Sequence, residues 1–357
     1  MQRFSAYDLH EQVHAILTAW GMPSGPATTT ADVMIDTDLS GIDSHGVSML
    51  MMYERLHTEG RLGLAATPRV LRETDAFAAI DAGSGLGHPA AVHAMELAIA
   101  KARNGGIGAA FVGSSNHYGA VGYYVRLAAE QGMIGFATTS TRTPTAQATG
   151  GNRPVLGTNP LAFAAPRRHG APLVVDMSTT VVAMNKVKAY ALKGLDLPVG
   201  WLVDEAGVDV TNATKGYALL QEGRAMLAPL GGPGTELGGH KGFGLALMVQ
   251  ILSAALSNGA LPRERGDTDN LGHFFLAIDA ERVNPGGLTA GNVEAILRVV
   301  QEDQPDVLVP GQPEEHARAE RTRAGIPLTD SLLEHLAAIS ARAGVHRTLT
   351  PLAEGTS

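Results

Sequence analysis

The sequence predicts an α/β (α+β) protein in which helices from both chain ends pack around a central unit of strands and helices. Three observations predict it. Residues 1 to about 75 carry apolar stripes at helical spacing, the pattern changes near Thr74 to short apolar runs between Gly and Pro clusters, and roughly the last fifty residues return to charged helical stretches. We therefore expect a helical domain from 1–75 plus about 301–357, and a central α/β domain at 76–300.

The first helices follow from hydrophobic periodicity. Leu9, Val13, Ile16 and Leu17 recur on one helical face and predict a helix over 6–20. Turns of Gly, Pro and Ser separate it from two further helical patterns, over 29–39 and 47–56.

The central unit is predicted from alternating strand-like and helical segments. Its expected strands are 76–81, 108–113, 134–139, 161–165, 173–176 and 274–279, and its expected helices are 89–103, 121–131 and 242–257. Near the C-terminus, charged helical patterns predict helices over 314–324 and 329–343.

Composition excludes several functional classes. The 357 residues include no cysteine, which rules out a disulfide framework, a thiol nucleophile and cysteine-ligated metal sites. A net charge of −8 without a basic run argues against nucleic acid as a partner. The longest apolar stretch, at 243–256, is too short and too polar to span a bilayer, and no targeting segment is evident, so we expect a cytoplasmic protein.

Two glycine-rich segments resemble nucleotide loops but fail on spacing. In GSGLG at 83–87 the third Rossmann glycine would fall on His88, and no acidic residue follows at ribose-binding distance, so a turn is expected. In GTELGGHK at 234–241, His240 interrupts the Gly-Lys pair of a P-loop. His240 and Lys241 nevertheless begin a long apolar helix, whose N-terminus favours an anion such as phosphate.

A short polar motif, Asp43-Ser44-His45-Gly46, lies between two predicted helices. Ser44 is a natural N-cap for the second helix, and the nearby helix dipole is expected to lower the pKa of His45. His45 is thus a candidate acid/base group near neutral pH. Ser44 is a poor hydrolase nucleophile, because neighbouring side chains rarely face each other and no G-x-S-x-G elbow is present.

Other polar turns leave alternatives open. The segment SSNHYG at 114–119 follows a predicted strand, where ligand loops commonly lie, and GTNP at 157–160 precedes another. There is no H-E-x-x-H motif, so no metal ligands are assigned. A metal-dependent hydrolase using His45 and His117 stays open only if these residues converge in space.

Six motifs in order resemble one family: SHGVSM at 44–49, SSNHYGAVGYY at 114–124, GTNPLAFAAP at 157–166, VDMSTT at 175–180, GGHKGFGLAL at 238–247 and NLGHFFLAID at 270–279. Over nearly the whole chain, the sequence resembles the type-2 malate/L-lactate dehydrogenases, which include ureidoglycolate, sulfolactate and diketogulonate enzymes and cyclic-imine reductases. The resemblance implies a non-Rossmann NAD(P)-binding fold, with a mixed or antiparallel central sheet and a helical unit. It also implies a homodimer with NAD or NADP as cofactor and a 2-oxo or 2-hydroxy acid as substrate.

The resemblance also implies roles for individual residues. His45 matches the proton donor, Ser44 its hydrogen-bonding partner and Thr158 a substrate contact. The matched cofactor-contacting residues are His117, Tyr118, Gly119, Ala120, Val121, Asp176, Met177, Ser178, His240, Lys241, Gly311 and Gln312.

The sequence departs from the family pattern at Met49. The family usually has an arginine there, expected to bind the substrate carboxylate, and a thioether cannot replace its charge-assisted hydrogen bonds. We expect altered substrate recognition with activity kept, with Arg142 as the candidate replacement cation and Arg153 behind it. The open alternatives are reduction of a C=N bond in a cyclic or N-alkyl imino acid and a non-catalytic dimer that retains cofactor binding. A second departure, Met184-Asn185-Lys186, has no account from the sequence.

Overall fold

The computed structural model describes residues 1–262, 269–304 and 306–353, so parts of both expected domains (263–268, 305 and 354–357) lie outside the described residues. The described elements are β1 (Gln2–Phe4), α1 (Ala6–Ala19), α2 (Ser24–Leu39), η1 (Val47–Met49), α3 (Leu50–Thr58), β2 (Arg69–Glu73), β3 (Phe77–Asp81), α4 (Gly87–Gly105), β4 (Ile107–Ser115), α5 (Gly122–Ala129), β5 (Met133–Thr139), β6 (Ala146–Gln147), β7 (Pro154–Leu156), β8 (Leu161–Ala165), β9 (Leu173–Met177), α6 (Met184–Leu192), β10 (Leu202–Asp204), α7 (Ala213–Gln221), β11 (Ala225–Leu227), α8 (Gly239–Gln250), η2 (Ile251–Ala255), β12 (Leu271–Asp279), α9 (Ala280–Val283), α10 (Leu288–Glu302), α11 (Gln312–Ala324), β13 (Ile326–Leu328) and α12 (Asp330–Arg342).

A seven-stranded sheet forms the centre of the molecule. Its strand order is β2-β3-β4-β12-β5-β8-β9, and only the β3–β4 pair is parallel. Helices α4 and α5 pack on it through an alanine-rich core, which lets helix and sheet approach closely. The mixed, mostly antiparallel sheet agrees with the predicted fold class and differs from the parallel sheet of a Rossmann domain.

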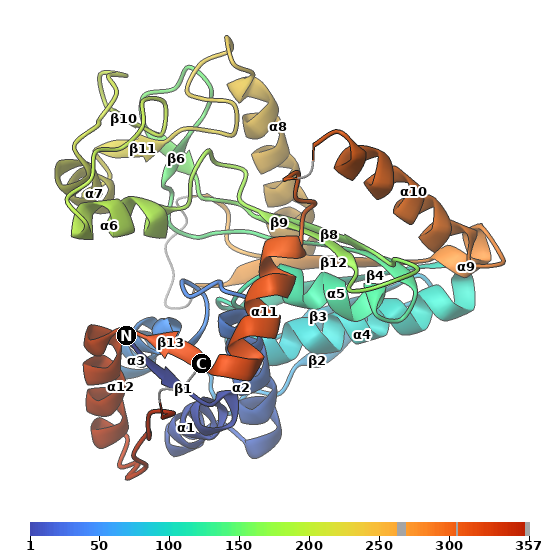
Figure 1. The fold of residues 1–357 in the computed structure, drawn as a ribbon, viewed down its shortest axis with the longest axis horizontal. Coiled ribbons are helices and arrows are strands. Elements are labelled where there is room, and N and C mark those ends of the chain that lie inside the picture. The colour runs from blue at the N-terminus through green and yellow to red at the C-terminus, as the bar shows by residue number, and fades with distance from the viewer. Residues whose placement is uncertain (263–268, 305, 354–357) are drawn as a thin grey trace.

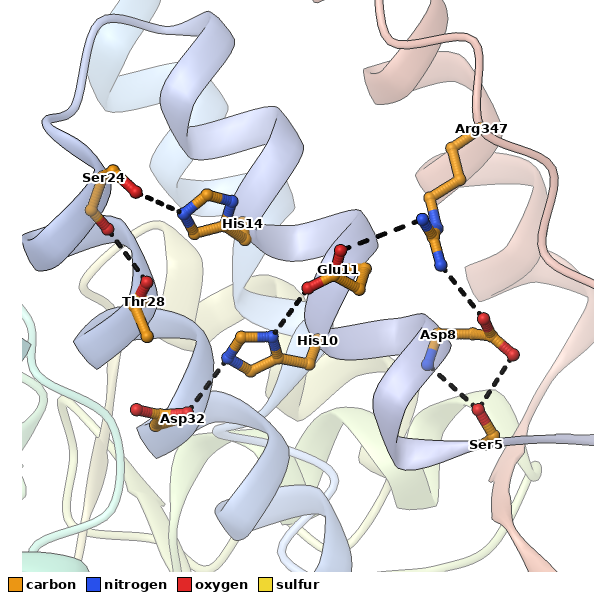
Figure 2. A network of polar contacts seen from close by, with 9 residues as sticks. All are labelled: Ser5, Asp8, His10, Glu11, His14, Ser24, Thr28, Asp32 and Arg347. Atoms are coloured by element: carbon orange, nitrogen blue, oxygen red, sulfur yellow. Dashed lines mark hydrogen bonds and ion pairs between the residues drawn. The ribbon is translucent and has the colours of Figure 1, made fainter.

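The two chain ends meet in a second hydrophobic core. Strand β1 pairs antiparallel with β13, so Phe4 lies opposite Ile326, and α1, α2, α3 and α12 gather around this pair (Figure 1). Polar contacts reinforce the arrangement. Arg347 donates to Asp8 at 3.0 Å and approaches Glu11, while His10 on α1 contacts Asp32 on α2 at 3.0 Å (Figure 2).

A third hydrophobic cluster forms where the sequence predicted no separate unit. Strands β6, β7, β10 and β11 make a four-stranded sheet, and α6 and α7 pack with it around residues such as Val187, Leu202 and Leu227. Figure 1 shows this group on the opposite side of the large sheet from the paired chain ends. Across the described residues, no helix is long and apolar enough to cross a membrane.

Most predicted elements form with shifted ends. The helix expected at 29–39 begins at Ser24, and the one expected over 47–56 divides into η1 and α3. The helix expected over 242–257 begins at Gly239 and changes to a π-helix at Ile251. Strand β2 was not predicted, because it is an exposed, charged edge strand without an apolar run.

Candidate functional site

The Ser44–His45 turn connects α2 to η1. The Ser44 hydroxyl Oγ lies 2.8 Å from Nδ1 of His45. The rule that adjacent side chains rarely face each other therefore fails here, whereas the pairing is the one that the family resemblance implied. The predicted N-cap role of Ser44 is also wrong, since Gly46 is the N-cap of η1 and the Ser44 hydroxyl binds the imidazole instead. This bond leaves Nε2 of His45 as the nitrogen that can exchange a proton with a ligand.

The protonation of His45 is governed by its surroundings. The side chain is partly buried, and desolvation lowers its pKa below the usual 6.5. The sequence therefore predicted the right direction, but burial is the cause in the structure. A neutral imidazole oriented by a hydroxyl is suited to accept a proton near neutral pH.

His117 lies beside His45 in the loop after β4. Their ring centroids are 5.6 Å apart and nearly parallel, with an interplanar angle of 26°. The Gly119 amide donates to His117 Nδ1 at 3.3 Å, so Nδ1 accepts and the neutral ring carries its proton on Nε2. Burial, followed by the nearby charge of His45, holds the pKa of His117 well below 6.5.

Two buried residues that the sequence did not single out support His117. The hydroxyl of Tyr53, on α3, lies 2.8 Å from His117 Nδ1, and His88 Nε2 approaches the same hydroxyl at 3.4 Å. With His117 Nδ1 as acceptor, the consistent order of donation is from His88 to Tyr53 to His117. Tyr53 is predictable only as a core aromatic, because its partner is 64 positions away.

The side chain of Tyr118 faces the core rather than a surface. It stacks on His273 with ring centroids 4.3 Å apart and on Tyr124 at 4.8 Å. Both nitrogens of His273 bind hydroxyls, Nδ1 that of Thr139 at 2.7 Å and Nε2 that of Ser115 at 2.8 Å. Tyr118 and His273 thus anchor the loop that carries His117.

The matched residues after β9 converge with two helix starts. Asp176 Oδ2 accepts the Gly122 amide, at the start of α5, at 2.7 Å. Gly311 precedes α11 with a φ of +93° and packs on Val174, where an added Cβ would lie 3.1 Å from the Val174 nitrogen. Asp176 keeps solvent contact, but the protein around it removes enough water to raise its pKa to about 6.

Gln312 closes the turn before α11. Its side-chain Oε1 accepts the backbone amide of Val309 at 2.8 Å, and its backbone amide donates to the Val309 carbonyl at 3.1 Å. The side chain therefore holds the 309–312 turn, beside β9, in shape.

The start of α8 carries the predicted anion site. Gly238 is its N-cap in the left-handed conformation, no side chain caps the helix, and the His240 and Lys241 side chains are exposed. Glycine is required at Gly239, where an added Cβ would lie 2.0 Å from the Gly232 carbonyl oxygen, and at Gly242, where it would lie 2.3 Å from that of Leu230. The chain thus folds tightly against this helix start.

Backbone hydrogen bonds connect α8 to the Thr158 turn. The Leu230 amide donates to the Thr179 carbonyl at 2.9 Å, and the Thr179 amide donates to the Thr158 carbonyl at 2.9 Å. Met177 and Ser178 therefore lie between the Asp176 contacts and this connection. Within the turn, Asn159 has a φ of +36° and its Oδ1 accepts the Gly157 amide at 2.9 Å, which explains a short polar residue there.

Met49 and Arg142 occupy different surroundings. Met49 ends η1 and packs, partly buried, against the N-terminal core. Arg142 donates to Asp269 at 2.9 Å, and Arg61 pairs with the same carboxylate. Its neighbour Thr141 contacts Asn159 at 3.3 Å, so Arg142 follows a residue that touches the Thr158 turn.

Asn185, in the second segment that departs from the family pattern, reaches the Ser44–His45 turn. Its Nδ2 lies 3.5 Å from the Ser44 carbonyl oxygen, which brings the first turn of α6 next to Ser44. Within the described ranges, no group of three or more His, Asp or Glu side chains has an arrangement that could hold a metal ion.

Comparison with known proteins identifies relatives over nearly the whole chain. The family model for malate/L-lactate dehydrogenases matches residues 4–337. A malate dehydrogenase from Pyrococcus abyssi is 38% identical over 347 residues, covering 95% of this chain and 94% of the relative. Two solved structures are similar over nearly their full length: malate dehydrogenase from Entamoeba histolytica (TM-score 0.92, 29% identity, 96% of this chain and 98% of that one) and delta1-piperideine-2-carboxylate reductase from Pseudomonas syringae pvar. tomato (TM-score 0.85, 27% identity, 95% and 100%).

The chain belongs to the malate/L-lactate dehydrogenase family. This membership confirms the enzyme class that the sequence predicted, an NAD(P)-dependent 2-hydroxyacid dehydrogenase, together with the fold class.

Proposed function

We propose that the protein transfers a hydride between a nicotinamide cofactor and a 2-oxo or 2-hydroxy acid, with His45 as the proton donor and acceptor. The observation that carries the proposal is the Ser44–His45 pair, a partly buried imidazole oriented by a hydroxyl at 2.8 Å, in a chain of this family. The cofactor, when bound, supplies or receives the hydride at the carbon that bears the reacting oxygen.

Residues of this chain transfer the proton and position the reactants. His45 Nε2 gives a proton to the substrate oxygen during reduction and takes it back during oxidation, and Ser44 keeps the ring oriented through Nδ1. The flat face of His117 borders the His45 ring, and its burial keeps it neutral, so it adds no competing positive charge. Alignment of the two reactants supplies much of the remaining acceleration.

The residues present fit an NAD(P) cofactor. A dinucleotide is anionic at its phosphates, and α8 begins with glycines, no side-chain cap and the exposed His240 and Lys241. We assign the phosphates to this helix start. The remaining cofactor contacts are assigned to the 117–121 loop, Asp176–Ser178 and the Gly311–Gln312 turn, which share the region around β9. Either NAD or NADP is compatible with these contacts.

Substrate recognition is proposed to differ from the family pattern because Met49 stands where an arginine is usual. Arg142 is the proposed carboxylate-binding cation, since Thr141 beside it touches the turn that contains Thr158. We expect Arg142→Ala to raise KM for a carboxylate substrate by about tenfold or more, the loss of a charge-assisted hydrogen bond. Steady-state kinetics measure this KM, with Arg72→Ala, at an exposed arginine of β2, as control. An unchanged KM would discard the assignment.

A second candidate is reduction of a C=N bond in a cyclic or N-alkyl imino acid. The structural similarity to delta1-piperideine-2-carboxylate reductase favours it, because the same hydride geometry and proton donor would serve an imine. A substrate panel of 2-oxo acids and cyclic imino acids, followed at the nicotinamide absorbance with NADH and with NADPH, separates the two.

The panel and a cofactor titration together test the proposal. We expect binding of at least one reduced nicotinamide cofactor and turnover of at least one 2-oxo acid. Cofactor binding without turnover on the panel would favour the non-catalytic alternative, and no binding of either cofactor would reject the dehydrogenase reaction.

We also propose that the protein is a homodimer. Apolar side chains remain exposed on α8, at Leu247 and Met248, and on α10, at Ile296 and Val299. Such exposed apolar faces mark subunit contacts more often than free surface. Light scattering is expected to give twice the chain mass, and the double variant Ile296→Glu, Val299→Glu is expected to give the monomer mass, whereas Val208→Glu, at an exposed loop valine, keeps the dimer.

A further inference from the structure

A buried carboxyl group lies directly beneath the catalytic turn. Asp38, in the last turn of α2, is only 2% exposed, and its Oδ2 accepts the Val47 amide at 2.8 Å. Gly46 packs on the same carboxyl group, since a Cβ there would lie 2.0 Å from Oδ1 and 2.3 Å from Oδ2. The carboxyl group therefore touches both residues that follow His45.

Burying the Asp38 carboxyl group lowers the stability of the fold, because the group loses its hydration. Burial, together with the nearby charge of Asp43, raises its pKa to about 8, although the Val47 hydrogen bond and Arg321 act to lower it. Arg321, on α11, donates to the Asp38 carbonyl oxygen and to the Asp43 carboxylate, so it holds the same turn from outside. An apolar side chain would fill a purely structural core position with less loss of stability, because it has no hydration to lose.

The hydrogen bonds of the turn indicate how Asp38 can fix the position of His45. The His45 amide donates to the Ile42 carbonyl at 3.0 Å and the Met49 amide to the Gly46 carbonyl at 3.0 Å, so short local bonds form both sides of the turn. The Asp38–Val47 bond ties the 46–47 peptide to α2. Without it the 46–47 peptide could rotate, and the His45 ring would move with its backbone relative to a bound substrate.

We propose that Asp38 is a positioning residue that fixes the backbone of the His45 turn through the Val47 amide. The kinetic part of this proposal rests on the proposed function, whereas the hydrogen bond itself is independent of it. A displacement of about 1 Å at a reacting group is enough to slow an enzyme about 100-fold, so a tether at this point bears directly on turnover.

Two substitutions at Asp38 test the role. Asp38→Leu keeps the branching of the side chain but leaves the Val47 amide without an acceptor, whereas Asp38→Asn keeps an acceptor oxygen. For Asp38→Leu we expect about tenfold or greater loss of kcat, cofactor affinity within about twofold, and about tenfold faster hydrogen exchange at the Val47 amide. Asp38→Asn is expected to restore most of the lost kcat and the slow exchange.

The control is Thr37→Val, at a buried neighbour on α2 whose hydroxyl donates to the Val33 carbonyl at 2.7 Å. It should lower stability without changing Val47 exchange. Gly46→Ala tests the contact from the turn side and is expected to lower kcat with Asp38 intact, which decides the question if Asp38→Leu does not fold. Unchanged Val47 exchange in a folded Asp38→Leu protein, or unchanged kcat in Gly46→Ala, would overturn the proposal. Should the wild type turn over no substrate, the amide exchange still gives the answer.

Discussion

Replacing His45 with glutamine is expected to lower kcat by about 10²–10⁴-fold, the usual contribution of a positioned proton donor. Glutamine is of similar size and can still contact Ser44, but it cannot exchange a proton in the required pH range. Cofactor affinity should stay within about twofold, because His45 is not among the residues assigned to cofactor contact. Stopped-flow absorbance of the nicotinamide and fluorescence titration measure the two quantities on the same preparation.

The pH dependence of kcat/KM is expected to follow the ionisation of His45. Its pKa lies below 6.5 because desolvation disfavours the imidazolium. Oxidation needs the neutral ring, so kcat/KM for the hydroxy acid should rise with pH, with its midpoint below pH 6.5, and reach a plateau at higher pH. The His45→Gln variant should lack this rise. The control is His346→Gln, at an exposed histidine. Near-normal turnover of His45→Gln with intact cofactor affinity would refute the proton-donor role.

Elements with a long apolar pattern could be predicted from the sequence. Helix α1 and strand β8 form where their side-chain periods indicate, because a single buried face dictates each of them. The strands of the third cluster could not, since β6, β7, β10 and β11 each have three residues or fewer, too short for any period to show. Their stability comes from packing with α6 and α7, which is a property of the tertiary structure.

The candidate site, too, could be predicted only in part from the sequence. His45 and the start of α8 could be singled out from local sequence, because a helix start changes the chemistry of residues next to it. The error about Ser44 arose there too: a side chain can cap a helix or bind its neighbour, and the backbone of the turn decides between them. Tyr53 contacts His117 from 64 positions away along the chain, and His88 contacts Tyr53 from 35 positions away. No local pattern indicates such pairings.

Replacing Asp38 with asparagine is expected to change how stability depends on pH. In the folded protein the pKa of Asp38 is about 8, whereas in the unfolded chain it is about 3.9, so between these values the folded state holds a proton that the unfolded state has released. Asp38 thus makes the free energy of unfolding fall with rising pH, by up to about 1.4 kcal/mol per pH unit. Asparagine cannot titrate, so the variant should lose this slope and gain stability relative to the wild type as the pH rises.

The pH dependence must be read from the difference in free energy of unfolding between the variant and the wild type. The reason is that buried histidines change stability with pH in the opposite direction to Asp38. His88 and His273, with pKa values of about 3, bind fewer protons folded than unfolded, so they make the protein more stable as the pH rises through the range below about 6.5. These contributions are the same in wild type and variant and cancel in the difference. Urea unfolding at about pH 5 and about pH 8 should therefore give a variant-minus-wild-type stability that increases with pH by several kcal/mol. A constant difference would mean that Asp38 titrates alike in both states, and hence that its carboxyl group is not desolvated beneath the His45 turn.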